Sequence, residues 1–164
     1  MTNPAEYIFD RRFDAPLALV WRTWTDPELL ARWYGPGIET IIHAYDLRPG
    51  GAWLNEMKWG GKSDLSKMAF TQVDPLKKLV WHHSSTDANW NVIANPMMSD
   101  WPKTLLTTVT FTAAGDQTDV RLSQLPINAT GAEITCFTNM MAGMSKGWGG
   151  GYAIIDQILA ELNG

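Results

Sequence analysis

The segment Phe13–Pro36, FDAPLALVWRTWTDPELLARWYGP, repeats one arrangement: a capping residue, a proline and then apolar residues at helical spacing. An aspartate before a proline is typical of a helix N-terminus, since the side chain accepts a backbone N–H and proline needs no partner in the first turn. The segment therefore predicts two short helices. We expect Asp14 to cap the first, Asp26 or Thr25 to cap the second, and Gly35 to end it.

Alternation of apolar and polar residues predicts strands on both sides of these helices. The expected strands are Glu6–Phe13, Ile38–Leu47, Ala52–Lys58, Ser66–Val73, Lys78–Ser84, Thr104–Thr112 and Thr118–Gln124. Short turns separate most of them, which favours antiparallel pairing. The stretch 85–102 has no clean period, and we expect a long loop there, a type of segment that is often functional in a compact domain.

From Ala129 the chain returns to a helical period and predicts one long C-terminal helix, capped by Asn128 or Thr130. Its apolar stripe consists of Ile134, Phe137, Met141, Met144, Trp148, Ile155, Ile158 and Leu162. Five glycines lie between positions 143 and 151, and each costs about 1 kcal/mol relative to alanine in a helix interior. Either the helix breaks near Trp148, or the small residues let it pack closely against its neighbours.

This order of elements predicts an α+β helix-grip fold, in which a curved antiparallel sheet of about six to seven strands surrounds the long C-terminal helix. Two short helices follow the first strand. The chain has 164 residues, and we expect a single domain over 1–164 because domains usually have about 100 to 200 residues. The sheet must bury its apolar face under the C-terminal helix, and the gap between them is a natural cavity.

The composition excludes several classes of partner. The net charge is −4 and the basic residues are scattered, whereas a nucleic-acid-binding protein needs a clustered basic face. The N-terminus has no signal-peptide pattern, and no apolar run approaches the roughly 18 residues of a membrane span. We therefore expect a cytoplasmic protein without a membrane partner, and the lone Cys136 agrees with a reducing compartment. Nine tryptophans indicate a wide apolar surface, in a core or around a ligand.

Motifs along the chain carry a resemblance to a known family. They are Phe13–Pro36, Asp46–Gly51, Val73–Pro75 with Leu79–Trp81, Val109–Phe111 with Thr118–Leu122, and Met144–Trp148. Together they resemble the activator-of-heat-shock-protein-90-ATPase-like family, part of the START-like (SRPBCC) superfamily that also contains the polyketide cyclases. The resemblance covers essentially the whole chain. It implies a barrel-like antiparallel sheet around the last helix and a cavity for a hydrophobic or aromatic ligand, without identifying that ligand.

We therefore predict that the protein binds a small apolar or aromatic molecule between the sheet and the C-terminal helix. The residues expected to line this cavity are Trp53, Asn55, Met57, Trp81, His83, Phe137, Met141, Met144 and Trp148. The residues expected to form a lid over its mouth, on the long loop, are Trp90, Met97, Met98 and Trp101. Methionine is flexible and polarisable, so a surface rich in it adapts to varied apolar ligands.

Two alternatives stay open. His82 and His83 are adjacent on a predicted strand, so at most one faces the cavity, where it, or Asn55, could move a proton in a cyclase- or aromatase-like enzyme. The other alternative is a protein-interaction module, either chaperone-associated or a homodimer. The chain has no nucleophile elbow, phosphate loop or dinucleotide fingerprint, and its histidines and Cys136 lack zinc-ligand spacing. We therefore predict a binding protein rather than an enzyme, with no metal or cofactor.

Overall fold

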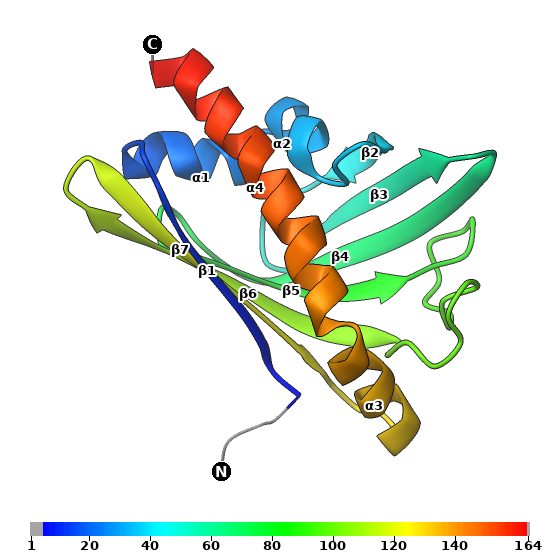
Figure 1. The fold of residues 1–164 in the computed structure, drawn as a ribbon. Helices are drawn as coiled ribbons and strands as arrows, with labels where there is room; N and C mark the ends of the chain where they lie inside the picture. The colour runs from blue at the N-terminus through cyan, green and yellow to red at the C-terminus, as the bar shows by residue number, and fades with distance from the viewer. Residues whose placement is uncertain (1–4, 164) are drawn as a thin grey trace.

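The computed structural model describes residues 5–163, and Figure 1 shows their arrangement. Residues 1–4 and 164, which the expected domain 1–164 includes, lie outside the described residues. The elements, in chain order, are β1 (Tyr7–Phe13), α1 (Leu17–Thr25), α2 (Pro27–Trp33), β2 (Glu39–Tyr45), β3 (Ala52–Trp59), β4 (Lys62–Asp74), β5 (Lys78–Ser85), β6 (Thr104–Ala114), β7 (Gln117–Pro126), α3 (Gly131–Asn139) and α4 (Met141–Asn163).

The strands form one antiparallel sheet in the order β1-β7-β6-β5-β4-β3-β2. The sheet is curved, and α4 runs diagonally across it, with α1 and α2 beside the C-terminal half of α4 (Figure 1). The predicted helix-grip fold is therefore confirmed. Strands in a sheet twist relative to one another, so a sheet of this size can bend around the helix that it buries.

Two of the predicted helix caps are confirmed and one is wrong. Asp26 caps α2 by accepting a hydrogen bond from a backbone N–H two residues later, at 3.0 Å. Thr130 and Glu133 form a reciprocal capping box at the start of α3. At α1 the N-cap is Pro16, with no side-chain hydrogen bond, so Asp14 is not a cap. The pattern of aspartate before proline therefore predicted the start of α1 correctly but not its N-cap residue.

The C-terminal segment is two helices rather than one, and the break lies at Met140 instead of near Trp148. The backbone N–H of Met140 closes the last turn of α3, and α4 then continues without interruption through its glycines. Close packing explains two of these glycines. A Cβ atom at Gly151 would lie 2.9 Å from the carbonyl oxygen of Trp33, and one at Gly150 would lie 3.1 Å from Pro36. Small residues therefore let the end of α2 lie directly against α4.

An aromatic cluster joins α1, α2, α4 and the sheet. The Tyr152 ring lies at its centre, between 5.2 and 6.2 Å from the ring centroids of Phe13, Trp24, Trp33 and Trp148. Such edge-to-face pairs add about 0.5–1.5 kcal/mol each beyond the burial of their area. The cluster therefore fixes α4 over one half of the sheet.

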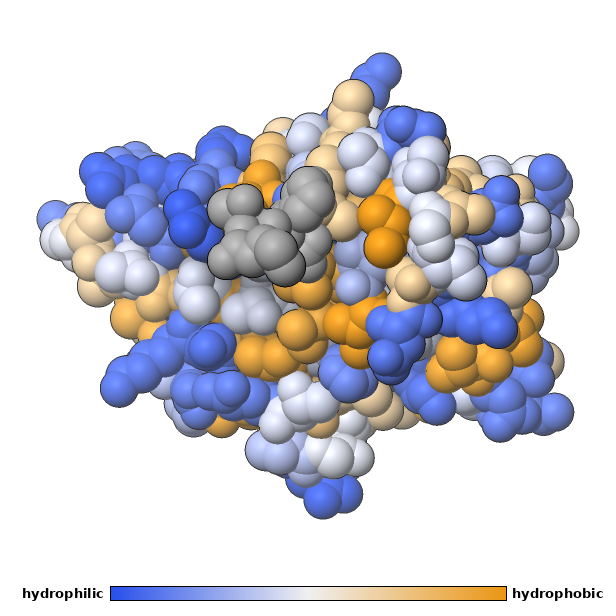
Figure 2. Space-filling view, turned by 90° about the horizontal axis from the view of Figure 1, so that it is seen from below, coloured by the Kyte–Doolittle hydropathy of each residue, from blue (hydrophilic) through white to orange (hydrophobic). Residues whose placement is uncertain are grey.

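Hydrophobic residues on the surface are dispersed rather than gathered over one element. In Figure 2 they form a broken band across the lower face of the molecule, between hydrophilic borders. The large hydrophobic side chains that are exposed are Ile8, Trp59, Leu76, Val92, Met97, Ile134 and Met140.

Among residues 5–163, no helix has the length and apolar character needed to cross a membrane.

Candidate functional site

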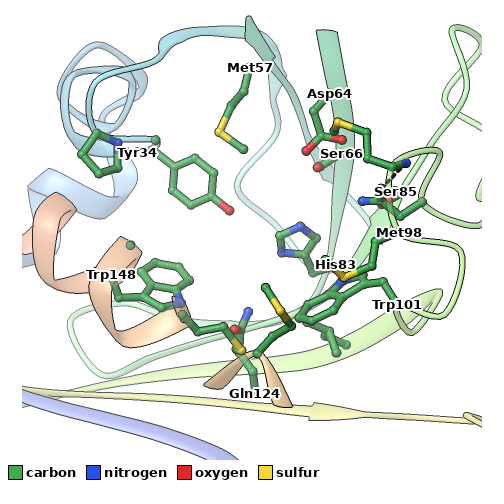
Figure 3. A pocket seen from close by; sticks show the side chains of 18 of the residues that line it. Tyr34, Met57, Asp64, Ser66, His83, Ser85, Met98, Trp101, Gln124 and Trp148 are labelled. Atoms are coloured by element: carbon green, nitrogen blue, oxygen red, sulfur yellow. Dashed lines mark hydrogen bonds between the residues drawn. The ribbon is translucent and has the colours of Figure 1, made fainter. Parts of the chain in front are cut away.

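A cavity of about 520 Å³ lies between the sheet, α4, the end of α2 and the loop that follows β5. Figure 3 shows side chains from all of these elements directed into one space. The lining residues are Trp33, Tyr34, Gly35, Pro36, Met57, Asp64, Ser66, His83, Ser85, Asn95, Met97, Met98, Trp101, Leu105, Gln124, Met140, Met144, Gly147 and Trp148. Nine of these residues are tryptophan, tyrosine or methionine, and six are aspartate, serine, histidine, asparagine or glutamine.

Four of the polar groups come from alternate positions of β4 and β5, and two others are Asn95 on the loop and Gln124 on β7. Asp64 and Ser66 face inward from β4, and His83 and Ser85 face inward from β5. Ser66 and Ser85 are paired across the two strands, so their side chains are neighbours on the same face. Strand periodicity thus gathers four polar side chains on one part of the wall.

His83 is directed into the cavity, whereas His82, its neighbour on β5, is not among the lining residues (Figure 3). The His83 Nδ1 atom is buried and has no hydrogen-bond partner among the described residues. Burial lowers the pKa of His83 from 6.5 to about 4, because a low-dielectric surrounding penalises the charged ring. At neutral pH this imidazole is therefore uncharged and offers a ligand both a hydrogen-bond donor and an acceptor.

Tyr34 is a further polar group of the wall, and it interacts electrostatically with Asp64. The Tyr34 hydroxyl points into the cavity in Figure 3, and burial together with the negative charge of Asp64 raises the pKa of this phenol. Burial also raises the pKa of the Asp64 carboxyl. Within residues 5–163, no hydrogen bond or ion pair to the Asp64 carboxyl is present. Tyr34 therefore stays protonated at neutral pH, and the Asp64 carboxyl is a hydrogen-bond acceptor without a partner among the described residues.

The loop after β5 closes one side of the cavity. The Asn95 amide donates to Ser85 Oγ at 3.2 Å, and the backbone N–H of Met97 donates to Asn95 Oδ1 at 2.9 Å. Trp101 packs its ring 5.5 Å from that of Phe137 on α3. These contacts hold Met97, Met98 and Trp101 against the cavity.

Trp90, the remaining residue of the predicted lid, lies away from the cavity wall. Its ring is 5.4 Å from that of His43 on β2, and Lys67 Nζ donates to its backbone oxygen at 3.0 Å. Trp90 also has a positive φ of 64°. It therefore anchors the far end of the loop to the outer side of the sheet.

The structure separates the residues predicted to bind a ligand into two groups. Met57, His83, Met144 and Trp148 line the cavity. Trp53, Asn55, Trp81 and Phe137 are buried in the core instead, and Met141 packs half-buried against that core.

The physical reason is that aromatic rings fill the half of the interior next to α1 and α2. Trp53 and Trp81 face inward as predicted, but their ring centroids lie 5.9 Å apart. Further rings enclose them, with Tyr45 at 6.0 Å from Trp53 and Phe70 at 6.1 Å from Trp81. The side-chain oxygen of Asn55 is used internally, since it accepts a hydrogen bond from Trp53 Nε1 at 3.1 Å. Inward orientation on a strand is therefore not sufficient for contact with the cavity.

Sequence reasoning missed Tyr34, Asp64, Ser66 and Ser85. The strand expected from Ser66 begins at Lys62, so Asp64 lay outside the expected sheet. Alternation from Met68 and Phe70 back through Ser66 and Asp64 was the signal that could have found both. Tyr34 follows α2 directly, and the positive φ of Gly35 then turns the chain toward β2.

No group of three or more metal-ligating side chains is present in the described part of the chain. His43 is on the outside of the sheet, where its Nε2 atom lies 2.8 Å from Glu56. Cys136 is a free, partly buried thiol on α3.

Comparisons with known proteins agree with this architecture. Residues 14–160 match the sequence model of a family described as Activator of Hsp90 ATPase homolog 1-like protein. A search of curated proteins found no match.

Three similar solved structures show the fold alone, because each is less than 25% identical to this chain. Protein Ms6760 from Mycobacterium smegmatis has 22% identity and a TM-score of 0.78, with 95% of this chain and 91% of that chain covered. Protein NE0264 from Nitrosomonas europaea has 23% identity and a TM-score of 0.76, with 99% of each chain covered. DynU16, from the dynemicin biosynthetic locus, has 17% identity and a TM-score of 0.66, with 95% of this chain and 47% of that chain covered.

Proposed function

The chain belongs to the Activator of Hsp90 ATPase homolog 1-like family, and from this premise we propose that it binds a small, mainly apolar or aromatic molecule in the cavity between the sheet and α4. The family is known for ligand binding. The observation that carries the proposal is the cavity itself. Its volume of about 520 Å³ lies within the range of about 300–1,000 Å³ that is usual for small-molecule sites.

The composition of the wall indicates the kind of molecule. Tryptophan, tyrosine and methionine side chains offer flat and adaptable apolar contacts, while a few polar groups on β4 and β5 orient the ligand. Burying an aromatic ring against such a wall is favourable by about 25 cal/mol for each Å² of apolar surface removed from water. A ligand with one aromatic ring system and one polar group fits this arrangement.

A proton-transferring enzyme, such as a cyclase or aromatase, is the second candidate. The observation that favours it is the position of His83 and Asp64 on the same cavity wall. General acid–base catalysis is most effective when the pKa of the group lies near the working pH. A histidine with a pKa of about 4 is a weak base, so His83 is better suited to hold a ligand by hydrogen bonds than to remove a proton from it.

Binding can be tested by isothermal titration with 2-naphthalenemethanol, an uncharged aromatic alcohol. We expect saturable binding of one molecule per chain. In the variant Met144→Trp the added ring occupies the cavity, and the affinity should fall by at least tenfold. Ile134→Trp adds the same ring at an exposed position on α3 and should bind as the parent protein does.

Circular dichroism of both variants shows whether they are folded before the titration. Met57→Trp provides a second way to fill the cavity, from β3 instead of α4. Failure of the parent protein to bind the alcohol, or equal affinity in the parent and both filled variants, would contradict binding in this cavity.

A further inference from the structure

The charges around the cavity are unbalanced. Asp64 is the one acidic residue among the lining residues, and no lysine or arginine lines the cavity within the described part of the chain. Transfer of a carboxylate into a low-dielectric site is costly unless a cation or hydrogen-bond donors compensate it. The wall thus presents one partly buried acidic group, and water or a ligand must compensate its charge.

The groups that face Asp64 do not supply a positive charge. Across the strand pair it is opposite Met57, and next along its own face is Ser66. The titratable groups on the other elements around it are Tyr34, after α2, and His83, on β5. Tyr34 keeps its proton at neutral pH because its pKa is raised, and His83 is uncharged because its pKa is about 4. A cation is therefore the complementary group that the cavity lacks.

Aromatic faces lie on the opposite side of the same space. Tyr34 and Trp148 are 5.9 Å apart in an edge-to-face arrangement, and both are directed into the cavity (Figure 3). Aromatic rings attract an organic cation through their quadrupole and also stack on a ligand ring. The same rings repel an anion, since their faces are negative.

From this placement we infer that the cavity selects an aromatic amine, with its ammonium group at Asp64 and its ring among Tyr34, Trp148 and the methionines, and rejects aromatic carboxylates. The inference rests on the proposed function, since it identifies the class of ligand for the same cavity. A charge-assisted hydrogen bond between the ammonium and Asp64 provides selectivity over an uncharged analogue.

Three probes that share one ring system test the inference: 2-naphthylmethylamine, 2-naphthalenemethanol and 2-naphthoate. We expect the amine to bind about tenfold more tightly than the alcohol, because hydrogen bonds to charged groups contribute more than neutral ones by about this factor. The carboxylate should bind at least tenfold more weakly than the alcohol. In Asp64→Asn the amine should lose its advantage while the alcohol binds as before.

The matched control is Asp116→Asn, which removes one negative charge from the exposed turn between β6 and β7 and leaves the cavity intact. It should keep the preference for the amine. If this variant lost the preference, the selectivity would come from the net charge of the protein rather than from Asp64.

A pH titration of the parent protein does not depend on the folding of any variant. The affinity for the amine should fall as the pH is lowered and Asp64, whose pKa burial raises, takes up a proton, while the affinity for the alcohol stays constant.

His83 is the other group that gains charge at low pH, so the titration is repeated with His83→Gln, which should retain the fall in amine affinity. Binding of the alcohol with equal or weaker binding of the amine would overturn the inference and leave the proposed function standing. Failure of all three probes to bind would count against both.

Discussion

Gly151, on α4, is the position where a single methyl group should most clearly disturb the packing of the helix. A Cβ atom there would lie 2.9 Å from the carbonyl oxygen of Trp33 and 3.1 Å from a carbon of its ring. The ring cannot turn away, because Trp33 is 1% exposed and its Nε1 atom donates to the Thr23 carbonyl at 2.8 Å. Relief therefore requires α2 and α4 to move apart.

The size of the effect follows from two opposing contributions. Replacing glycine by alanine in a helix interior is favourable by about 1 kcal/mol. Overpacking of a filled site costs about 1–3 kcal/mol, and the upper end applies here because the closest atom belongs to the backbone. We expect Gly151→Ala to lower the free energy of unfolding by about 1–2 kcal/mol, which corresponds to a decrease in Tm of several degrees for a chain of this size.

Gly143→Ala is the matched control in the same helix. The nearest atom to its added Cβ is Met140 Cε at 3.9 Å, an ordinary contact, so only the helix-propensity contribution remains. This variant should be more stable than the parent by about 0.5–1 kcal/mol. Urea unfolding followed by far-ultraviolet circular dichroism measures both variants. If Gly151→Ala were as stable as Gly143→Ala, the argument from close packing of α2 on α4 would be refuted.

Two further predictions concern caps and pH. Asp26→Ala removes the hydrogen bond that caps α2 and should lower the free energy of unfolding by about 1 kcal/mol. Asp14→Ala should change the free energy of unfolding little, because Asp14 does not cap α1. Equal losses for the two variants in urea unfolding would contradict this. Burial holds the pKa of His83 at about 4 in the folded chain against 6.5 in an unfolded one, so stability should be lost as the pH falls from about 6.5 toward 4, by at most about 3 kcal/mol. Asp64 has a raised pKa, so its protonation stabilises the folded chain as the pH falls. Because Asp64 is present in the parent and in both variants, this contribution cancels in the comparison. Unfolding experiments at several pH values measure the effect. Relative to the parent, His83→Gln should lose less stability on acidification, and His82→Gln should lose the same amount. The reverse result would exclude His83 as the source of the pH dependence.

The order of elements and the fold could be predicted from the sequence because they depend on local signals. The cap at Asp26 and the alternation within each strand act over a few residues. The break at Met140 could not be predicted in this way. The segment on either side of it has continuous helical periodicity, and the packing of Trp101 on Phe137 fixes α3 separately from α4.

The candidate site was only partly predictable for a different reason. Periodicity indicates which side chains point inward, as it did for Trp53, Trp81 and His83. It does not indicate where the interior is filled and where it is open, because that depends on rings from distant segments. Trp53 meets Tyr34, which follows α2, and Tyr45, on β2, and is enclosed by them. His83 lies farther along the sheet, where no ring fills the space, and therefore reaches the cavity.

The position of β1 in the sheet has a consequence for how the chain is made. The first strand lies at one edge and pairs only with β7, and the adjoining contact, from Thr118 Oγ1 to the Ala15 carbonyl, joins residues 103 positions apart. Contacts between distant residues slow folding, since a long loop must close before they form. While the ribosome makes the middle of the protein, Tyr7, Phe9 and Phe13 have no partner strand. β1 therefore stays without its strand partner until β7 has left the ribosome.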